Sequence, residues 1–199
     1  MTPAFAYPHE APPTGAAAAF AARLQAMPPR LETPRLVLRA PMIEDFQPFA
    51  GIMLSDRAAF MVGEAPYTRD NAWFEFTHCV AGWLLRGHGM WTIEAREGGE
   101  VLGFVLIHME PGDREPELGW FLTEAAEGHG YALEASRAVR DWGLGDLGLA
   151  SLVSYIDPPN ARSIRLAERL GAWRDRPAET GFDEPVLVYR HAPRLEAQA

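Results

Sequence analysis

The chain has 199 residues, of which 48% are hydrophobic and 23% charged, and its formal net charge is −9. This length and composition predict one soluble globular domain that can bury a core without metals or disulfides. The negative charge argues against broad binding to the phosphate backbones of nucleic acids. It suits a cationic partner, although solubility alone is a sufficient reason for it.

The single cysteine, Cys79, cannot form an internal disulfide, and we expect it to be a small buried apolar residue. No apolar run is long enough to span a bilayer, and prolines interrupt an N-terminal stretch that has no basic start. We therefore expect a cytoplasmic protein that binds no membrane and acts as a monomer or homodimer.

Three regions are expected along the chain. Residues 1–29 are rich in alanine and proline and predict an N-terminal extension with one short helix from Ala16 to Met27. A folded domain is expected over residues 30–192, followed by a C-terminal tail over residues 193–199.

The domain opens with alternating polar and apolar residues and continues with two apolar patterns at helical spacing. Three strands with short turns between them then predict an antiparallel meander. In chain order the expected elements are a strand at Arg35–Arg39, helices over Ile43–Leu54 and Trp73–Leu84, strands at Met90–Arg96, Val101–Met109 and Glu117–Leu122, a helix over Gly128–Trp142, a strand at Leu152–Ile156, a helix over Asn160–Leu170, an additional strand at Ala172–Arg176 and a last strand at Val186–Arg190.

This order predicts an α/β (α+β) fold, with a central mixed, mostly antiparallel sheet of six to seven strands flanked by about four helices.

One glycine pair carries the first chemical signal. Gly128 and Gly130 flank His129 between a strand and a long helix, where exposed N–H groups and the helix dipole favour an anion such as a pyrophosphate. Taken alone, the same pair is equally compatible with an ordinary turn. Asn160 follows two prolines and predicts a helix cap, which leaves its amide free to contact a ligand as well.

Four segments in this order and spacing resemble the GNAT (Gcn5-related N-acetyltransferase) superfamily, and within it the branch of ribosomal-protein-serine/alanine N-acetyltransferases. They lie within residues 31–190. The segments are Leu31–Arg39 (LETPRLVLR), Glu117–Leu122 (ELGWFL), Gly128–Ala135 (GHGYALEA) and Asn160–Ala172, which opens with NARS and closes with LGA.

The resemblance implies the GNAT fold, acetyl-CoA as co-substrate without a metal, and transfer of acetyl to a primary amine on a small molecule or a protein N-terminus. It places the pantetheine arm along the backbone of Trp120, Phe121 and Leu122. It also implies that backbone N–H groups hold the pyrophosphate at Glu127, Gly128, His129, Gly130 and Tyr131, and that Asn160 contacts the pantetheine.

Two positions depart from the family pattern. Ala125 stands where a glutamine or arginine is frequent, and Ala167 stands where some members carry a tyrosine that protonates the departing thiolate. Ser163 is the candidate for that vacant role and also for a cofactor contact. The departures leave open a non-catalytic CoA-binding protein, and the fold also permits another acyl-CoA.

Glu117 is the preferred proton acceptor, and a solvated strand residue is the competing interpretation. Tyr155 is a lesser candidate, while Glu134 is expected to have a structural or capping role. His129 is expected at the surface. His78, His88 and His108 show no ligand spacing with carboxylates, so no metal site is expected. The acidic stretch from Glu110 to Glu127 and the aromatics between Met61 and Trp83 are candidates to border the acceptor site, although the acidic residues suit a solvated loop as well.

Overall fold

The computed structural model of the chain describes residues 7–58 and 66–191. The predicted tail and the first part of the region expected to border the acceptor site, from Met61, lie outside the described residues. Within the described part, no helix combines the length and the apolar character needed to cross a membrane.

Eight described strands form one sheet in the order β1-β2-β3-β4-β5-β6-β8-β7. Neighbouring strands are antiparallel except for β5 and β6, which are parallel. The strands are β1 Leu31–Glu32, β2 Leu36–Arg39, β3 Met90–Ala95, β4 Val101–His108, β5 Glu117–Leu122, β6 Val153–Ile156, β7 Trp173–Arg174 and β8 Leu187–Arg190.

The mixed, mostly antiparallel α/β sheet is confirmed, but the predicted six to seven strands are too few. The additional strand is β1. The segment Leu31–Arg39, which resembles a single first strand of the family, forms two strands that fold back on each other, so that Leu31 pairs with Leu38. Thr33 explains the turn between the two strands, because its side chain accepts the Leu36 N–H at 2.9 Å and its own N–H bonds the Leu36 carbonyl at 3.0 Å.

Five α-helices are described. They are α1 Gly15–Gln25, α2 Phe46–Met53, α4 Arg69–Arg86, α5 Tyr131–Leu144 and α6 Ala161–Arg169.

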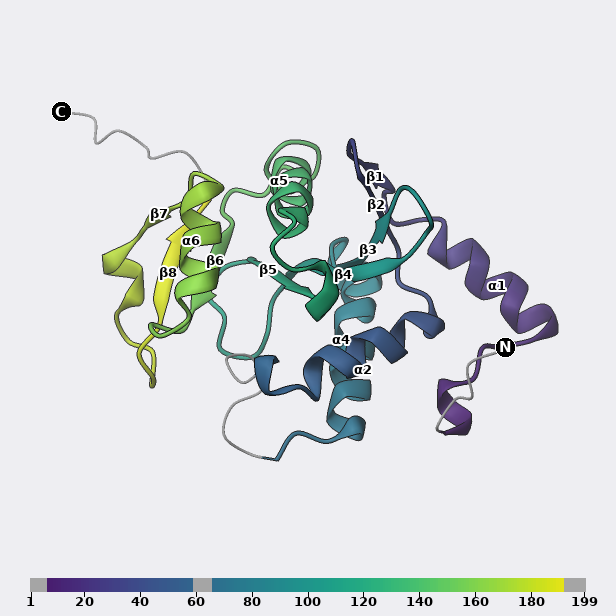
Figure 1. The fold of residues 1–199 in the computed structure, drawn as a ribbon. Coiled ribbons are helices and arrows are strands. Elements are labelled where there is room, and N and C mark those ends of the chain that lie inside the picture. Colours follow the sequence, from purple (N-terminus) through teal and green to yellow (C-terminus); the bar gives the residue numbers. More distant parts are fainter. Residues whose placement is uncertain (1–6, 59–65, 192–199) are drawn as a thin grey trace.

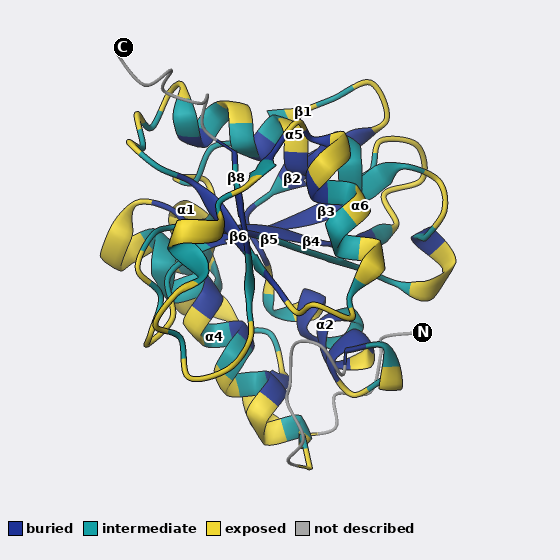
Figure 2. Cartoon of the chain, turned by 90° about the vertical axis from the view of Figure 1, so that its left-hand side faces the viewer, coloured by how far each residue is buried: buried dark blue, intermediate teal, exposed yellow. Residues whose placement is uncertain are grey.

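The helices cover both faces of the sheet (Figure 2). Helix α5 packs Ala135 and Val139 against Trp91 and other buried residues of one face, while α2 and α4 form a second core on the opposite face around Phe49 and Phe104. Both cores meet β4 and β5, which places the ends of these strands in the middle of the molecule.

The N-terminal segment lies beside the domain, with α1 away from the sheet (Figure 1). No residue of α1 is buried. The short 3-10 helix Pro8–Glu10 is instead anchored, because the Glu10 side chain is buried and receives hydrogen bonds from Arg69 at 2.6 and 2.9 Å and from Gln47 at 3.0 Å.

Candidate active site

Strands β5 and β6 separate soon after they meet. The register pairs Glu117 with Val153, and two hydrogen bonds that involve side chains bridge the strands nearby, from Ser154 Oγ to the Leu118 carbonyl at 2.6 Å and from the Tyr155 N–H to the Glu117 carboxylate at 3.2 Å. Beyond that point β5 remains paired with β4 as far as Leu122. Its other edge therefore offers unpaired backbone groups toward the gap, which are suited to an extended polar ligand.

The turn before α5 has the geometry that an anion site requires. Gly128 and Gly130 have φ values of 78° and 80°, a left-handed conformation that glycine adopts without strain. Gly130 is also the N-cap of α5. No atom lies within 4 Å of where a Gly128 side chain would begin, so the backbone there is open to a ligand.

Glu134 holds this turn in place. Its carboxylate accepts hydrogen bonds from Thr33 Oγ1 at 2.6 Å, from the Arg35 N–H at 3.0 Å and from Arg35 Nε at 2.7 Å. Arg35 in turn donates to the His129 carbonyl at 3.0 Å. Burial acts to raise the pKa of Glu134, but the hydrogen bonds from Thr33 and Arg35 outweigh it and lower the pKa. These contacts are those of the structural role predicted for Glu134.

A cavity of about 270 Å³ extends from this turn to α6. Three arginines line it, Arg57, Arg162 and Arg169, which gives it the charge that phosphates require. The Glu127 carboxylate lies between two of them and forms ion pairs with Arg57 and Arg162. The remaining lining residues are Ile52, Trp120, Phe121, Leu122, Gly128, Gly130, Ala132, Leu133, Asn160, Ser163 and Leu166.

Helix α6 begins as its sequence predicts. The Asn160 side chain accepts the Ser163 N–H at 3.1 Å and so caps the helix, while the same residue lines the cavity. Gly171 follows the helix with a φ of 83°. Ala167 is fully buried beneath α6, so a larger side chain at that position would displace the core. Ser163 remains the hydroxyl of α6 that lines the cavity.

A second cavity of about 270 Å³ also borders β5. Trp120 and Phe121 line both cavities, so the two adjoin at the free part of β5. The second cavity is acidic, and none of its described lining residues is a lysine or arginine. The lining consists of Phe49, Met53, Tyr67, Glu75, Cys79, Leu106, His108, Glu110, Glu117, Gly119, Trp120, Phe121 and Tyr155.

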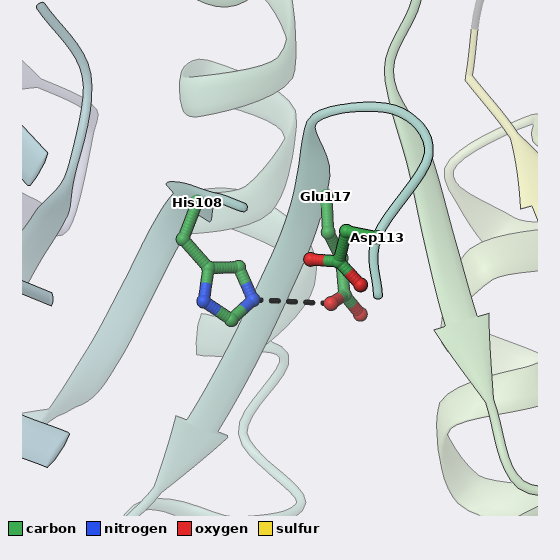
Figure 3. Close-up of side chains that lie close together, drawn as sticks. All are labelled: His108, Asp113 and Glu117. Carbon is green, nitrogen blue, oxygen red and sulfur yellow. Dashed lines mark hydrogen bonds and ion pairs between the residues drawn. The ribbon is translucent and has the colours of Figure 1, made fainter. Parts of the chain in front are cut away.

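Glu117 lies where β5 and β6 begin to diverge and is held on both oxygens. His108, its partner in the β4–β5 register, contacts Oε2 through Nε2 at 3.0 Å (Figure 3). The Tyr155 N–H donates to Oε1 at 3.2 Å. Since its side chain is only 17% exposed, Glu117 is a fixed carboxylate that lines this second cavity.

The electrostatic effect of these carboxylates extends to their neighbours. Burial would lower the pKa of His108, but its hydrogen bond to Glu117 and the charges of Glu117, Glu110 and Asp113 raise it. Burial raises the pKa of Glu110, and the charges of Glu75, Glu117 and Asp113 add to this effect against that of His108. Burial, then Glu75, Cys79 and Glu110, raise the pKa of Tyr67 to about 12.

Two other candidates are better explained as structural. The Tyr155 hydroxyl accepts the backbone N–H groups of Arg114 at 3.3 Å and Glu115 at 3.2 Å, and burial raises its pKa. It therefore fixes the β4–β5 turn. Cys79 is buried, and burial raises its pKa well above the usual value, which makes its thiol a poor nucleophile.

The sequence shows no ligand spacing between His108 and carboxylates, but the fold brings this histidine close to two of them. Ligand atoms of His108, Asp113 and Glu117 lie within 4.8 Å of one another (Figure 3). Cross-strand pairing brings His108 to Glu117, which linear spacing does not reveal. Asp113 accepts the Glu110 N–H at 2.6 Å and His108 contacts Glu117, so both carboxylates already have partners within the protein.

The structure brings most of the predicted cofactor residues around one cavity. The exceptions are His129 and Tyr131: the His129 side chain is exposed, as predicted, and Tyr131 packs beneath Arg35. Glu117 and Ser163 line different cavities. Sequence reasoning gave no ligand role to Arg57, Arg169, Glu75 and His108, whereas Tyr67 belongs to the aromatics expected to border the acceptor site. A signal existed for Arg169 alone, since it lies about two helical turns from Arg162 and therefore on the same face of α6.

The comparisons with known proteins agree with this geometry. A family model described as an acetyltransferase (GNAT) domain matches residues 35–172. The crystal structure of an acetyltransferase from Agrobacterium tumefaciens str. C58 has a TM-score of 0.76 and 40% identity, covering 83% of this chain and 95% of that one.

Two further relatives define the breadth of the match. The ribosomal-protein-S5-alanine acetyltransferase from Vibrio fischeri has a TM-score of 0.62 at 14% identity, over 81% of this chain and 95% of that one, and so shares the fold. The uncharacterized protein YkkB of Bacillus subtilis (strain 168) is 32% identical over 108 residues, which are 52% of this chain and 62% of YkkB. The chain thus spans less than two thirds of that curated relative. With the family model covering more than half of its length, the chain belongs to the GNAT acetyltransferase family.

Proposed function

We propose that this chain transfers the acetyl group of acetyl-CoA to a primary amine by direct attack while both substrates are bound. The observation that carries the proposal is the pair of cavities that adjoin at β5, one lined by arginines and the other by carboxylates. An anionic co-substrate suits the first cavity, and a cationic amine suits the second.

The charge of the cofactor cavity suits the phosphates of acetyl-CoA. Backbone N–H groups from Glu127 to Tyr131 would hold the pyrophosphate, and its phosphates would take the place of the Glu127 carboxylate between Arg57 and Arg162. The free edge of β5 from Trp120 to Leu122 would pair with the pantetheine arm. Bound there, acetyl-CoA supplies an acetyl group activated as a thioester.

The protein's own contribution is placement and proton handling. Glu117 accepts the proton that the attacking amine must lose, and His108 keeps its carboxylate oriented. A backbone N–H of the free β5 edge orients the acetyl carbonyl oxygen. The Ser163 hydroxyl, on the cofactor side, donates to the departing sulfur. Holding the two substrates together accounts for much of the rate.

The acceptor is a primary amine on a small molecule or at a protein N-terminus. The acceptor-side cavity of about 270 Å³ admits one amine-bearing group of modest size. Its carboxylates would attract the ammonium form, and Glu117 would then remove a proton as the amine approaches the thioester.

Thiol release tests the proposal. The protein is incubated with acetyl-CoA and a panel of amines, free CoA is quantified, and products are identified by mass spectrometry. We expect thiol release that depends on the amine and an acetylated product for each released CoA. Tight CoA binding without any transfer would instead identify a non-catalytic CoA-binding protein. Faster turnover with propionyl-CoA would assign a different acyl donor.

A further inference from the structure

We propose that the preferred acceptor carries a second cationic group in addition to the amine that receives acetyl. This inference rests on the proposed function and assigns a substrate class to the same acceptor-side cavity. Glu117 would receive the reacting amine, while Glu75 and Glu110 would hold the second charge.

Three carboxylates from three different elements point to this class. Glu75 comes from α4, Glu110 follows β4 and Glu117 begins β5, and all three line the acceptor-side cavity. Their depths differ: the Glu117 side chain is 17% exposed, whereas that of Glu110 is 47% exposed. An elongated dication would therefore find one carboxylate inside the cavity and another near its mouth.

The cavity has more negative charge than the protein neutralises. His108 is the cationic side chain among the described lining residues, and it lies between Glu117 at 3.0 Å and Glu110 at 3.4 Å. Asp113 adds a further carboxylate beside it. Glu75 accepts a hydrogen bond from the Cys79 thiol at 3.3 Å, a weak neutral donor that supplies no counter-charge.

One buried polar atom on the cavity wall also lacks a partner. Among the described residues, Tyr67 Oη is shielded from solvent and has no hydrogen-bond partner, whereas His108 Nδ1 lies 3.4 Å from the Glu110 carboxylate. Leaving such groups unsatisfied costs free energy, so native proteins usually pair them with a ligand or water. Rings of Phe49, Phe121 and Tyr155 complete the wall and suit the apolar chain that joins two amines.

The chemistry explains why one positive charge is insufficient. The attacking nitrogen must be neutral when it reaches the acetyl group, so it cannot remain the counter-ion of the cavity during the reaction. A second ammonium does not react and keeps its charge throughout. It would pair with Glu75 and Glu110 in both the ground state and the transition state.

A matched pair of substrates tests this inference. In 1-aminohexane a methyl group replaces the second ammonium of 1,5-diaminopentane, so the two differ in charge and barely in length. We expect kcat/KM to favour the diamine by about tenfold or more, in buffer with EDTA so that no metal fills the carboxylates. Glu75→Gln and Glu110→Gln should each reduce this preference. Glu97→Gln, on the exposed β3–β4 turn, is the matched control and should retain it.

Equal kcat/KM values for the two amines would overturn the inference, as would a preference that persists in both cavity variants. A separate measurement keeps this inference testable if the proposed acetyl transfer is not observed. If no amine is acetylated, the diamine is titrated calorimetrically into the CoA-loaded protein. Binding that weakens in Glu110→Gln would support the dicationic ligand without acetyl transfer, and absence of diamine binding would refute it.

Discussion

Asn160 links the fold to the proposed cofactor site at the scale of one side chain. Its amide oxygen caps α6 and its position lines the cofactor cavity. We predict that Asn160→Ala weakens CoA binding by about 1–2 kcal/mol and also lowers the melting temperature, because a cap and a ligand contact are lost together.

Calorimetric CoA titration and thermal unfolding separate the two effects. Asn71→Ala is the matched control, since Asn71 belongs to the cap of α4 and lies outside the cofactor cavity. It should lower the melting temperature and leave CoA affinity unchanged. Unaltered CoA affinity in Asn160→Ala would remove Asn160 from the cofactor site.

Glu134 makes stability depend on pH. Its hydrogen bonds to Thr33 and Arg35 lower its pKa from the ordinary value of 4.5, so its contribution is complete above that value and lost as the pH falls through the lowered pKa. We predict that Glu134→Gln reduces the free energy of unfolding by about 1–3 kcal/mol at pH 7, and by less near pH 3.

Urea unfolding at the two pH values measures this difference. Glu100→Gln, at an exposed position of the β3–β4 turn, serves as the control and should change neither value. If wild type and Glu134→Gln differed by the same free energy of unfolding at both pH values, the charge of Glu134 would contribute nothing to stability.

The junction between the glycine turn and α5 carries the proposed anion site at the scale of an element. Gly130 has a φ of 80°, and valine there would be strained and would narrow the space for a pyrophosphate. We predict that Gly130→Val reduces CoA affinity at least tenfold. The comparison variant is Gly99→Val, whose φ of 68° lies in an exposed turn: it should lose stability but retain CoA affinity. Equal CoA affinities for Gly130→Val and wild type would place the pyrophosphate elsewhere.

The elements themselves follow closely from sequence pattern, whereas their pairing does not. Strand β5 has its predicted bounds, and Gly87 and Gly171 end their helices in the left-handed conformation expected of them. The contact between His108 and Glu117 depends on the β4–β5 register. Alternation locates each strand but leaves its partner undefined, and for that reason the contact between His108 and Glu117 was missed.

At the scale of the whole molecule, the N-terminal segment is held to the domain by the contacts of Glu10. Glu10 is buried, and its carboxylate pairs with Arg69 at 2.6 Å while α1 has no buried residue. We predict that Arg69→Gln releases this segment, because the variant removes the cationic partner that donates two hydrogen bonds to the buried Glu10 carboxylate. Limited proteolysis with mass spectrometry should then show early cleavage between residues 11 and 30.

Arg23→Gln is the control for this prediction, since Arg23 lies over the Phe20 ring within α1 and is not part of the Glu10 pair. An unchanged cleavage pattern in Arg69→Gln would mean that other contacts hold the segment. The division between an extension over residues 1–29 and a domain over residues 30–192 stays a prediction until that experiment is done.

Four spaced segments were enough to recognise the family of the whole chain, but the two cavities could not be predicted from the sequence. The glycine turn and Asn160 identify the proposed cofactor side in the sequence because each belongs to a segment that resembles the family. The acceptor side combines Tyr67, Glu75 and Glu117 from distant parts of the chain, and only the packing of α4 against the sheet brings them together.

The most direct test of the account is kcat measured against pH, with one good amine, for wild type and Glu117→Gln. Because the glutamine keeps size and hydrogen bonding but cannot accept a proton, we predict a kcat lower by about 10²–10⁴-fold with unchanged CoA affinity. Wild-type kcat should rise with pH as the ammonium loses its proton more readily. A glutamine variant with the wild-type kcat and the same pH profile would contradict the role of Glu117 and leave proximity alone to explain the rate.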